Sequence, residues 1–257
     1  MFNDLDNKMR HYETYRDQLI LPGVQAIVRL DGRNFTGMTR NPKYNFETPF
    51  DVKFNKLMVD TVDYIMRESG FNIIYGYTQS DEISLMLHVG DTTFNRKVRK
   101  ILSGLSSMAS AYFTLNFGNI ATFDARVSEL ITTENVEDYF RWRQLDATRN
   151  ALNSWCYWTL RKNGDSVSAA TSALSGKTVS EKNEILFAYG INFKDLPAWQ
   201  KRGVGLYWKE VDHEGYNPIT KEKIMTVRRR VLHNNELPFP EEYIQEIIKP
   251  IIAGQYS

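Results

Sequence analysis

The sequence predicts an α+β protein in two parts: a ferredoxin-like antiparallel sheet with helices, and a mainly helical C-terminal extension. In the first half, apolar runs and amphipathic segments follow in the order strand, helix, strand, strand, helix, strand. This is the order of a split βαβ unit, which folds as an antiparallel sheet with its helices on one face. In the second half, residues 135–162 contain no proline or glycine, as is typical of a long helix.

The elements of the first half follow from the spacing of their apolar residues. Four runs have the character of buried strands: 25–30, 73–77, 83–87 and 122–130. Helical spacing predicts three helices: 3–18, 51–69 and about 94–117. Pro22 and Gly23 break the first helical pattern, and Gly70 ends the second. Residues 36–50, which contain two prolines, are expected to form a loop.

The second half begins with the long helix expected over residues 135–162. It carries a polar stripe at 3-4-3 spacing: Arg143, Asp146, Asn150 and Asn153. Thr178 and Glu181 form a capping-box signature before a helix that runs through Ala188. A hairpin of strands 203–211 and 224–232, with a turn-rich connection at Tyr216-Asn217-Pro218, and a last helix over 240–249 complete the expected elements. We divide the chain near residue 134, into regions 1–134 and 135–257, and expect the second to pack on the first.

Composition and charge limit the classes of function. A net charge of +1 excludes a strongly basic nucleic-acid binder, although a local basic face remains open. The single cysteine, Cys156, cannot form an internal disulfide, which fits a reducing compartment. No apolar run approaches the roughly 18–20 residues of a membrane span, and residues 1–6 are polar and acidic, unlike a secretory signal. We therefore expect a cytoplasmic protein with no membrane partner.

Two carboxylates stand at the ends of predicted neighbouring strands. Asp31 ends the first strand and precedes Gly32, where a backbone carbonyl can approach a ligand closely. Asp81 precedes the strand 83–87 after a tight connection. Two such carboxylates can hold a pair of Mg²⁺ ions for phosphoryl transfer. A solvated surface carboxylate is the alternative for either residue, and Glu82, which alternates away from Asp81, is interpreted as a structural partner.

Other features leave more than one interpretation open. The backbone amides of residues 33–36 follow a strand and could cradle phosphates, although no glycine-rich phosphate loop is present. The Trp and Tyr side chains of residues 139–158 could stack on bases or pack in a helical core. The run Arg228–Arg230 could contact RNA or be a solvated strand.

Six short segments carry a resemblance to a known family. They are, in chain order, RLDGRNF (29–35), QSDE (79–82), FDARV (123–127), WRQLD (142–146), KNEILF (182–187) and GINF (190–193). Together they resemble the tRNA(His) guanylyltransferases and their prokaryotic relatives, the 3′–5′ tRNA-repair polymerases. The resemblance covers roughly residues 5–210, and its combination of segments is highly specific.

The resemblance implies a polymerase palm fold, with residues 1–134 as the palm-like catalytic region. It implies that Asp31 and Asp81 are catalytic and bind two Mg²⁺ ions together with the carbonyl of Gly32. The implied nucleotide-binding residues are Gly32, Arg33, Asn34, Phe35, Thr36, Ser80 and Asp81. The implied contacts to phosphate or tRNA are Lys97, Lys100, Arg126, Lys182 and Asn183.

In such enzymes ATP or GTP activates a tRNA 5′ end, and the 3′-hydroxyl of an incoming nucleotide then attacks that end. The implied partners are tRNA and nucleoside triphosphates, and the implied assembly is a homotetramer. Residues 148–154 lack the eukaryotic His-Ile-Asn-Asn-Leu-Tyr-Asn signature, and Thr48 replaces a family lysine. These departures favour general tRNA 5′-end repair over strict tRNA(His) guanylylation. The alternatives are a palm-domain nucleotide cyclase or dinucleotide synthase, and a non-enzymatic RNA-binding protein.

Overall fold

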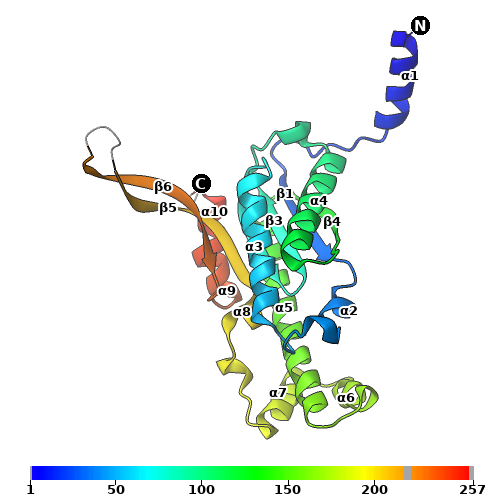
Figure 1. The fold of residues 1–257 in the computed structure, drawn as a ribbon, viewed down its shortest axis with the longest axis vertical. Helices are drawn as coiled ribbons and strands as arrows, with labels where there is room; N and C mark the ends of the chain where they lie inside the picture. Colours follow the sequence, from blue (N-terminus) through cyan, green and yellow to red (C-terminus); the bar gives the residue numbers. More distant parts are fainter. Residues whose placement is uncertain (1, 217–220, 255–257) are drawn as a thin grey trace.

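A six-stranded antiparallel sheet forms the centre of the protein, in the order β4-β1-β3-β2-β5-β6 (Figure 1). The structure is a computed structural model that describes residues 2–216 and 221–254. The first four strands and the two helices between them have the ferredoxin-like order that the sequence predicts. They are β1 (Gln25–Gly32), α3 (Val52–Glu68), β2 (Ile73–Gln79), β3 (Glu82–Leu87), α4 (Val98–Phe117) and β4 (Phe123–Leu130).

The remaining elements lie before, between and after these strands. In the first half they are α1 (Phe2–Thr14), α2 (Phe35–Thr39) and the 3₁₀ turns η1 (Pro42–Tyr44) and η2 (Thr93–Arg96). In the second half they are α5 (Thr133–Lys162), α6 (Val167–Leu174), α7 (Val179–Ala188), η3 (Phe193–Asp195), α8 (Ala198–Arg202), β5 (Val204–Tyr216), β6 (Lys223–Asn234), α9 (Pro240–Tyr243), the π-helical turn η4 (Ile244–Ile248) and α10 (Lys249–Ile252).

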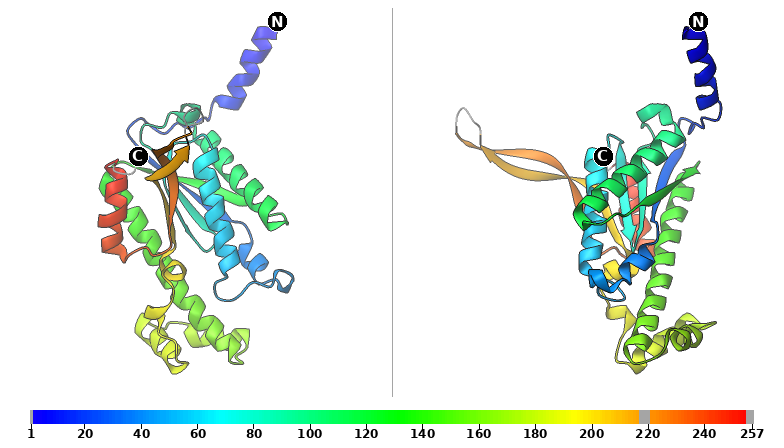
Figure 2. Two further views of the ribbon diagram at one scale, coloured as in Figure 1. Left: turned by 60° about the vertical axis from the view of Figure 1, so that its left-hand side comes forward. Right: turned by 45° about the vertical axis from the view of Figure 1, so that its right-hand side comes forward.

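Helices cover both faces of the sheet (Figure 2). Because side chains alternate along a strand, Val28 and Leu30 point to the face covered by α3 and α4, whereas Ile27 points to the other. That second face is covered by α5 and the C-terminal helices, and its core includes Phe140 and Tyr243. The expectation of helices on one face therefore holds for α3 and α4, and the extension buries the opposite face.

Local signals account for the helix starts that position the site. The Asp51 carboxylate accepts the backbone N–H of Phe54 at 2.8 Å and caps α3. The predicted capping box is present at α7, where the Thr178 and Glu181 side chains each accept the other residue's backbone N–H. Both helices thus begin where their polar side chains indicate.

Several boundaries differ from the prediction. Residues 36–50 are not all loop, because α2 and η1 lie within residues 35–44. Helix α4 begins at Val98 rather than near 94, because Phe94 and Asn95 are left-handed (φ 52° and 54°) and cannot continue a right-handed helix. Helix α6 was not predicted, and the last helix is interrupted by the π-helical turn. Of the predicted connection Tyr216-Asn217-Pro218, residues 217 and 218 lie outside the described part.

The hairpin of β5 and β6 is part of the central sheet. Strand β5 pairs with β2, with Thr78 opposite Val204 and Tyr75 opposite Tyr207. Beyond this contact the two strands extend away from the body as a twisted arm, and α1 projects from another side (Figure 1). Across the described ranges, no helix combines the length and the apolar character needed to cross a membrane.

Candidate active site

Asp31 and Asp81 meet at one edge of the sheet. Strands β1 and β3 are antiparallel neighbours, with Asp31 opposite Glu82, so the end of β1 lies beside the start of β3. The backbone N–H of Gly32 donates to the carbonyl oxygen of Asp81 at 3.0 Å. Both aspartates line the same cavity, of about 230 Å³, together with Ser80 and Glu82. The structure therefore brings the two predicted carboxylates together.

Asp81 is a carboxylate in an unfavourable electrostatic environment. Burial raises its pKa, and the negative charge of Asp31 raises it further, while hydrogen bonds from its own backbone amide and from the Ser80 side chain act in the opposite direction. Ser80 occupies the tight β2–β3 turn with φ 55°. Within residues 2–216 and 221–254, no basic side chain forms an ion pair with Asp81. A cation at this cavity would relieve the repulsion between the two carboxylates.

Asp31 has basic neighbours on its own side of the sheet. The Arg126 Nη2 atom lies 3.2 Å from Asp31 Oδ2 and 3.2 Å from Asp124 Oδ1. Arg29 Nε lies 3.7 Å from Asp31 Oδ2, and Arg29 faces Arg126 across the β1–β4 pair. The structure thus places the predicted residue Arg126 directly beside the carboxylates, with a half-exposed guanidinium that can reach a ligand.

The polar stripe of α5 forms the opposite wall of the cavity. Arg143, Asp146 and Asn150 all line it. The Arg143 side chain is only 6% exposed; its Nη1 lies 2.7 Å from Glu82 Oε2 and its Nη2 lies 3.0 Å from Asp146 Oδ2. Its guanidinium also stacks on Trp142, 3.7 Å from the ring centroid. Glu82 is therefore a structural partner, as interpreted from the sequence.

Arg143 and Asp146 were not among the residues assigned to the site from the sequence. Their 3-4-3 spacing with Asn150 was the available signal, because such a stripe must face one side of the helix. The spacing does not say whether that side faces solvent or the carboxylates. Only the packing of α5 against the sheet decides this.

The predicted phosphate-binding amides at residues 33–36 are only partly available. The Arg33 N–H donates to the Thr122 carbonyl at 2.8 Å, so the prediction for this amide is wrong: a neighbouring chain segment already uses it. The amides of Phe35 and Thr36 open α2, where helix geometry provides no internal partner. Asn34, which precedes α2, is left-handed (φ 61°) and exposed.

Phe35 is a core residue whose side chain packs against Gly32 at the end of β1. It is 2% exposed, and the centroid of its ring lies 5.0 Å from the ring centroids of both Phe113 and Phe123. A Cβ atom on Gly32 would lie 2.5 Å from the Phe35 ring. Gly32 is therefore required for close packing beside the two aspartates, where its N–H donates to the Asp81 carbonyl.

Lys97 and Lys100 are not brought to the carboxylates. They lie at the start of α4, which follows β3 after that strand has crossed the sheet away from Asp81. Lys97 Nζ lies 3.0 Å from Asp17 Oδ2, and hydrogen bonds from Arg99 and Lys97 lower the pKa of Asp17 to about 2. The prediction that these lysines contact phosphate at this site is not supported within one chain.

Lys182 and Asn183 lie on α7, which packs near the far end of α5 (Figure 1). The Lys182 carbonyl accepts the Cys156 thiol at 3.3 Å, and the Asn183 amide donates to the Val179 carbonyl at 2.8 Å. They belong to the extension, away from the two aspartates.

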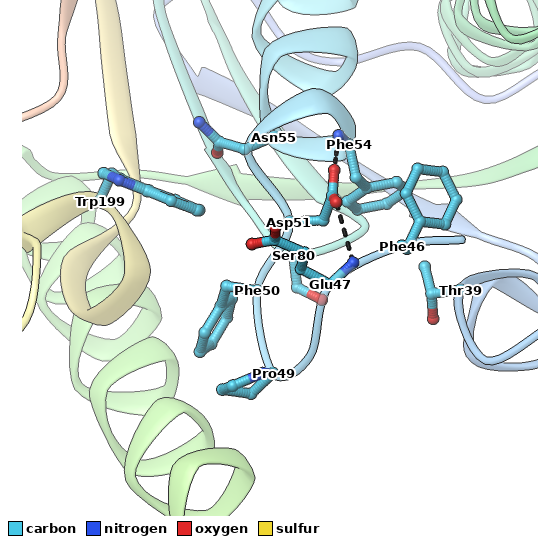
Figure 3. Close-up of a pocket in the computed structure, with 10 residues that line it drawn as sticks. All are labelled: Thr39, Phe46, Glu47, Pro49, Phe50, Asp51, Phe54, Asn55, Ser80 and Trp199. Carbon is cyan, nitrogen blue, oxygen red and sulfur yellow. Dashed lines mark hydrogen bonds between the residues drawn. The ribbon is translucent and has the colours of Figure 1, made fainter. Parts of the chain in front are cut away.

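A second, smaller pocket adjoins the carboxylate cavity and shares Phe50 and Ser80 with it. It measures about 80 Å³, and Figure 3 shows the rings of Phe46, Phe50 and Trp199 around it. The Asp51 carboxylate accepts the N–H groups of Glu47 (2.9 Å) and Phe54, which fixes the loop that forms this wall. From the sequence, residues 36–50 were expected to form a loop in which Thr48 replaces a family lysine, and an aromatic pocket was not predicted there.

The donor set at the carboxylates fits Mg²⁺ better than an all-protein metal centre. In the described part of the chain, no group of three or more His, Cys, Asp or Glu side chains converges on one point. Mg²⁺ is commonly bound by one or two carboxylates, with water and substrate phosphates completing its shell. Asp31, Asp81 and the Gly32 carbonyl supply such a partial set, and no basic side chain in the described part of the chain pairs with Asp81.

Comparison with known proteins identifies the family. The family model described as tRNAHis guanylyltransferase matches residues 6–133, and the one described as Thg1 C terminal domain matches residues 134–246. The chain belongs to the tRNA(His) guanylyltransferase family. The tRNA(His) guanylyltransferase of Neurospora crassa is 34% identical over 79% of this chain and 73% of its own length. That of Debaryomyces hansenii is 31% identical over 91% of this chain and 90% of its own.

Solved structures of tRNA(His) guanylyltransferases share the fold. A bacterial Thg1-like protein in complex with ATP has a TM-score of 0.73 and 25% identity, over 96% of this chain and 99% of its own. The Saccharomyces cerevisiae enzyme has a TM-score of 0.71 and 26% identity, over 86% of this chain and 95% of its own. The predicted α+β fold, the family resemblance and the predicted enzyme class, nucleotidyltransferase, are all confirmed.

Proposed function

We propose that this protein is a Mg²⁺-dependent 3′–5′ nucleotidyltransferase that repairs tRNA 5′ ends. It would activate the 5′ end with ATP or GTP and then add nucleotides in the reverse direction. The observation that carries this proposal is the meeting of Asp31 and Asp81 in one cavity, joined through the Gly32–Asp81 hydrogen bond. Family membership and the ATP- and GTP-bound bacterial structures support the nucleotide as substrate.

Asp31, Asp81 and the Gly32 carbonyl would hold two Mg²⁺ ions. When bound, the ions would supply positive charge for the leaving phosphates and favour ionisation of the attacking hydroxyl. The two carboxylates hold their places through the backbone pairing of β1 with β3. Arg126, beside Asp31, would face the phosphate at the RNA 5′ end, as a guanidinium suits phosphate geometry.

The reaction has two displacements. In the first, an oxygen of the RNA 5′-monophosphate attacks the α-phosphorus of ATP or GTP, a P–O bond forms, and pyrophosphate leaves. In the second, the 3′-hydroxyl oxygen of the incoming nucleotide attacks the 5′-phosphorus of the RNA. The hydroxyl proton passes to water, and the nucleoside monophosphate from the first step leaves. The RNA thus grows at its 5′ end.

The nucleotide would lie between the carboxylates and the aromatic pocket. We assign its phosphates to the Ser80–Asp81 turn and the amides of Phe35 and Thr36. Its base would enter the pocket lined by Phe46, Phe50 and Trp199, which opens beside Ser80. Aromatic side chains offer a stacking surface for any base, which suits an enzyme that accepts several nucleotides.

The rest of the proposal concerns the whole enzyme. Lys182 and Asn183 would contact tRNA on the extension, while Lys97 and Lys100 would contact it only at a separate surface. We also propose a homotetramer, as the family resemblance implies, and a cytoplasmic location, which the single Cys156 favours.

The test uses a 5′-truncated, 5′-monophosphorylated tRNA with ATP, Mg²⁺ and all four nucleoside triphosphates. We expect extension at the 5′ end, and its loss in Asp31→Asn and Asp81→Asn by more than about a hundredfold, because several kcal/mol of charge stabilisation disappear. Asp138→Asn is the matched control, since Asp138 is an exposed carboxylate of α5 paired with Arg141. No extension by the wild type, beside an active family member, would reject the proposal. Products formed from nucleotides alone would favour a cyclase or dinucleotide synthase.

A further inference from the structure

A cavity of about 510 Å³ adjoins the carboxylate cavity along α5, and none of the assigned residues lines it. Ser154 lines both cavities, so the two lie side by side along α5. Tyr157 and Trp158 of α5 form one wall, Arg40 at the end of α2 forms a second, and α6 contributes a third through Val167 and Thr171.

The aromatic residues of this wall differ from their neighbours on α5. Cys156 is fully buried in a small core with Leu186, and the partly buried Trp155 packs against this core. Tyr157 and Trp158 are half-buried and face the open cavity instead. Core packing therefore explains Trp155 and Cys156, whereas Tyr157 and Trp158 belong to none of the described core clusters.

Two aromatic rings and one cation lie next to each other in the lining of this cavity. The Tyr157 and Trp158 rings meet edge to face, with centroids 5.3 Å apart. The Arg40 guanidinium carbon lies 5.8 Å from the Tyr157 centroid and 5.9 Å from that of Trp158. Of the described residues that line the cavity, none is acidic. Partly exposed aromatic rings that line a cavity beside an arginine suit a nucleobase and its phosphate, and the absence of carboxylates avoids repelling the phosphate.

We propose that Arg40, Tyr157 and Trp158 form a stacking site for a base of the RNA substrate, a short distance inside its 5′ end. This rests on the function proposed above and adds a site that holds the RNA strand. The path from Asp146 to Trp158 follows one helix for about 18 Å, at 1.5 Å per residue. RNA whose 5′ phosphate lies at Asp31 and Asp81 can follow α5 past Ser154 to these rings.

The experiment compares variants of the full-length protein that keep or remove the aromatic faces. Trp158→Phe and Tyr157→Phe keep a ring, whereas Trp158→Leu and Tyr157→Leu keep apolar bulk without one. The probe is a 5′-monophosphorylated, 5′-truncated tRNA, labelled at its 3′ end for anisotropy or carrying 2-aminopurine near its 5′ end. Tyr12→Ala, an exposed aromatic residue of α1, and Arg67→Ala, an exposed arginine of α3, are the controls.

We expect each leucine variant to bind the RNA about tenfold more weakly, in the range measured for loss of one base–aromatic stack. The phenylalanine variants and controls should bind within about twofold of the wild type. The KM for ATP should be unchanged, and 2-aminopurine should be quenched by the wild type and less so by Trp158→Leu.

Three results would overturn the stacking site. One is that both leucine variants, shown to be folded by circular dichroism, bind the RNA as tightly as the wild type does. Another is a raised KM for ATP with unchanged RNA binding, which would assign the rings to a free nucleotide. The third is a changed oligomeric mass with unchanged RNA binding, which would make the wall a protein interface. If the wild-type enzyme binds and extends the RNA in the same experiments, the proposed function holds. Any of these three results then counts against the stacking site alone.

Discussion

Asp81 shows how the environment of one residue links the stability of the fold to pH. Its pKa is raised above the ordinary value of 3.8, mainly by burial and further by the charge of Asp31. The folded protein therefore holds a proton at Asp81 more tightly than the unfolded chain does. Stability contributed by this group is greatest at low pH and is lost as pH rises from about 3.8 through the raised value. The ionised form of Asp81 is thus held in a partly buried position without an ion pair to a basic side chain among the described residues.

Removing that charge should stabilise the metal-free protein. We expect Asp81→Asn to have a higher Tm than the wild type at pH 7 without Mg²⁺, with the difference shrinking toward pH 4. Mg²⁺ at a hundredfold excess over its Kd should stabilise the wild type by about 2.7 kcal/mol, or roughly 5–10 °C for a chain of this length. Differential scanning fluorimetry across pH and Mg²⁺ concentration measures both effects. An equal response to Mg²⁺ in Asp81→Asn would contradict the metal assignment.

Arg143 should be essential for stability as well as for the site. Arg143→Ala leaves Glu82 and Asp146 without their shared cation in a mostly buried position. The expected loss is at or below the roughly 3–5 kcal/mol known for breaking a fully buried pair. Urea unfolding monitored by circular dichroism gives the difference.

Arg149→Ala is the matched control, because Arg149 also pairs with Asp146 but is 71% exposed. An exposed pair of this kind contributes about 0–1 kcal/mol. Equal losses in the two variants would mean that burial does not govern this cluster.

At the scale of elements, the connection from β3 to α4 depends on one buried arginine. Arg96 donates to four backbone carbonyls: Ile20 (3.1 Å), Val89 (2.9 Å), Asp91 (3.0 Å) and Val24 (2.6 Å). These carbonyls belong to the segment before β1 and to the loop after β3. The arginine therefore ties the start of β1 to the entry of α4.

Arg96→Lys should destabilise the protein almost as much as Arg96→Ala. A lysine has three donors on a single nitrogen and cannot reproduce the planar fork that reaches four carbonyls. We expect a loss of about 2–3 kcal/mol or more, since each buried carbonyl left unpaired costs about 1–3 kcal/mol. Hydrogen exchange should show faster exchange at the start of β1 and α4. Full rescue by lysine would show that charge alone is sufficient there.

The elements also show what sequence reasoning can reach. The two aspartates were predictable because each stands at the end of a strand, and the antiparallel order places those ends together. The start of α4 was not predictable, because the left-handed backbone of residues 94–96 is set by tertiary contacts and not by the spacing of apolar residues. The Arg33 amide was misassigned because its partner, Thr122, is distant in the sequence. Periodicity identified β5 as a strand but carried no information that β2 would be its neighbour.

At the scale of the whole molecule, the second half of the chain completes the sheet of the first. Residues after 134 bury one face of the sheet, and β5 covers the edge of β2. The Trp208 indole also donates to the Ile73 carbonyl at 2.8 Å. The division near residue 134 thus separates two regions that share one sheet.

A fragment of residues 1–134 should not fold stably. It would expose Ile27, Ile74, Tyr75, Tyr77 and Met86, all buried in the intact chain. Loss of that burial removes about 1.5–3 kcal/mol for each large apolar side chain, more than the usual total stability of a domain can absorb. We expect a broad thermal transition and strong binding of a hydrophobic dye by the fragment, with the full chain as control. A cooperative transition in the fragment would establish an autonomous palm.

The arm of β5 and β6 ends the sheet with an open edge. The β6 strand has no partner on its outer side among the described residues, and Arg228, Arg229 and Arg230 are exposed along it. The free backbone N–H and C=O groups of an uncovered edge strand can pair with a strand of another polypeptide, and repeated pairing yields insoluble fibres. A row of like charges makes self-addition electrostatically unfavourable. The arginines thus allow the long edge strand β6 to stay exposed to water, at high protein concentration, without starting aggregation.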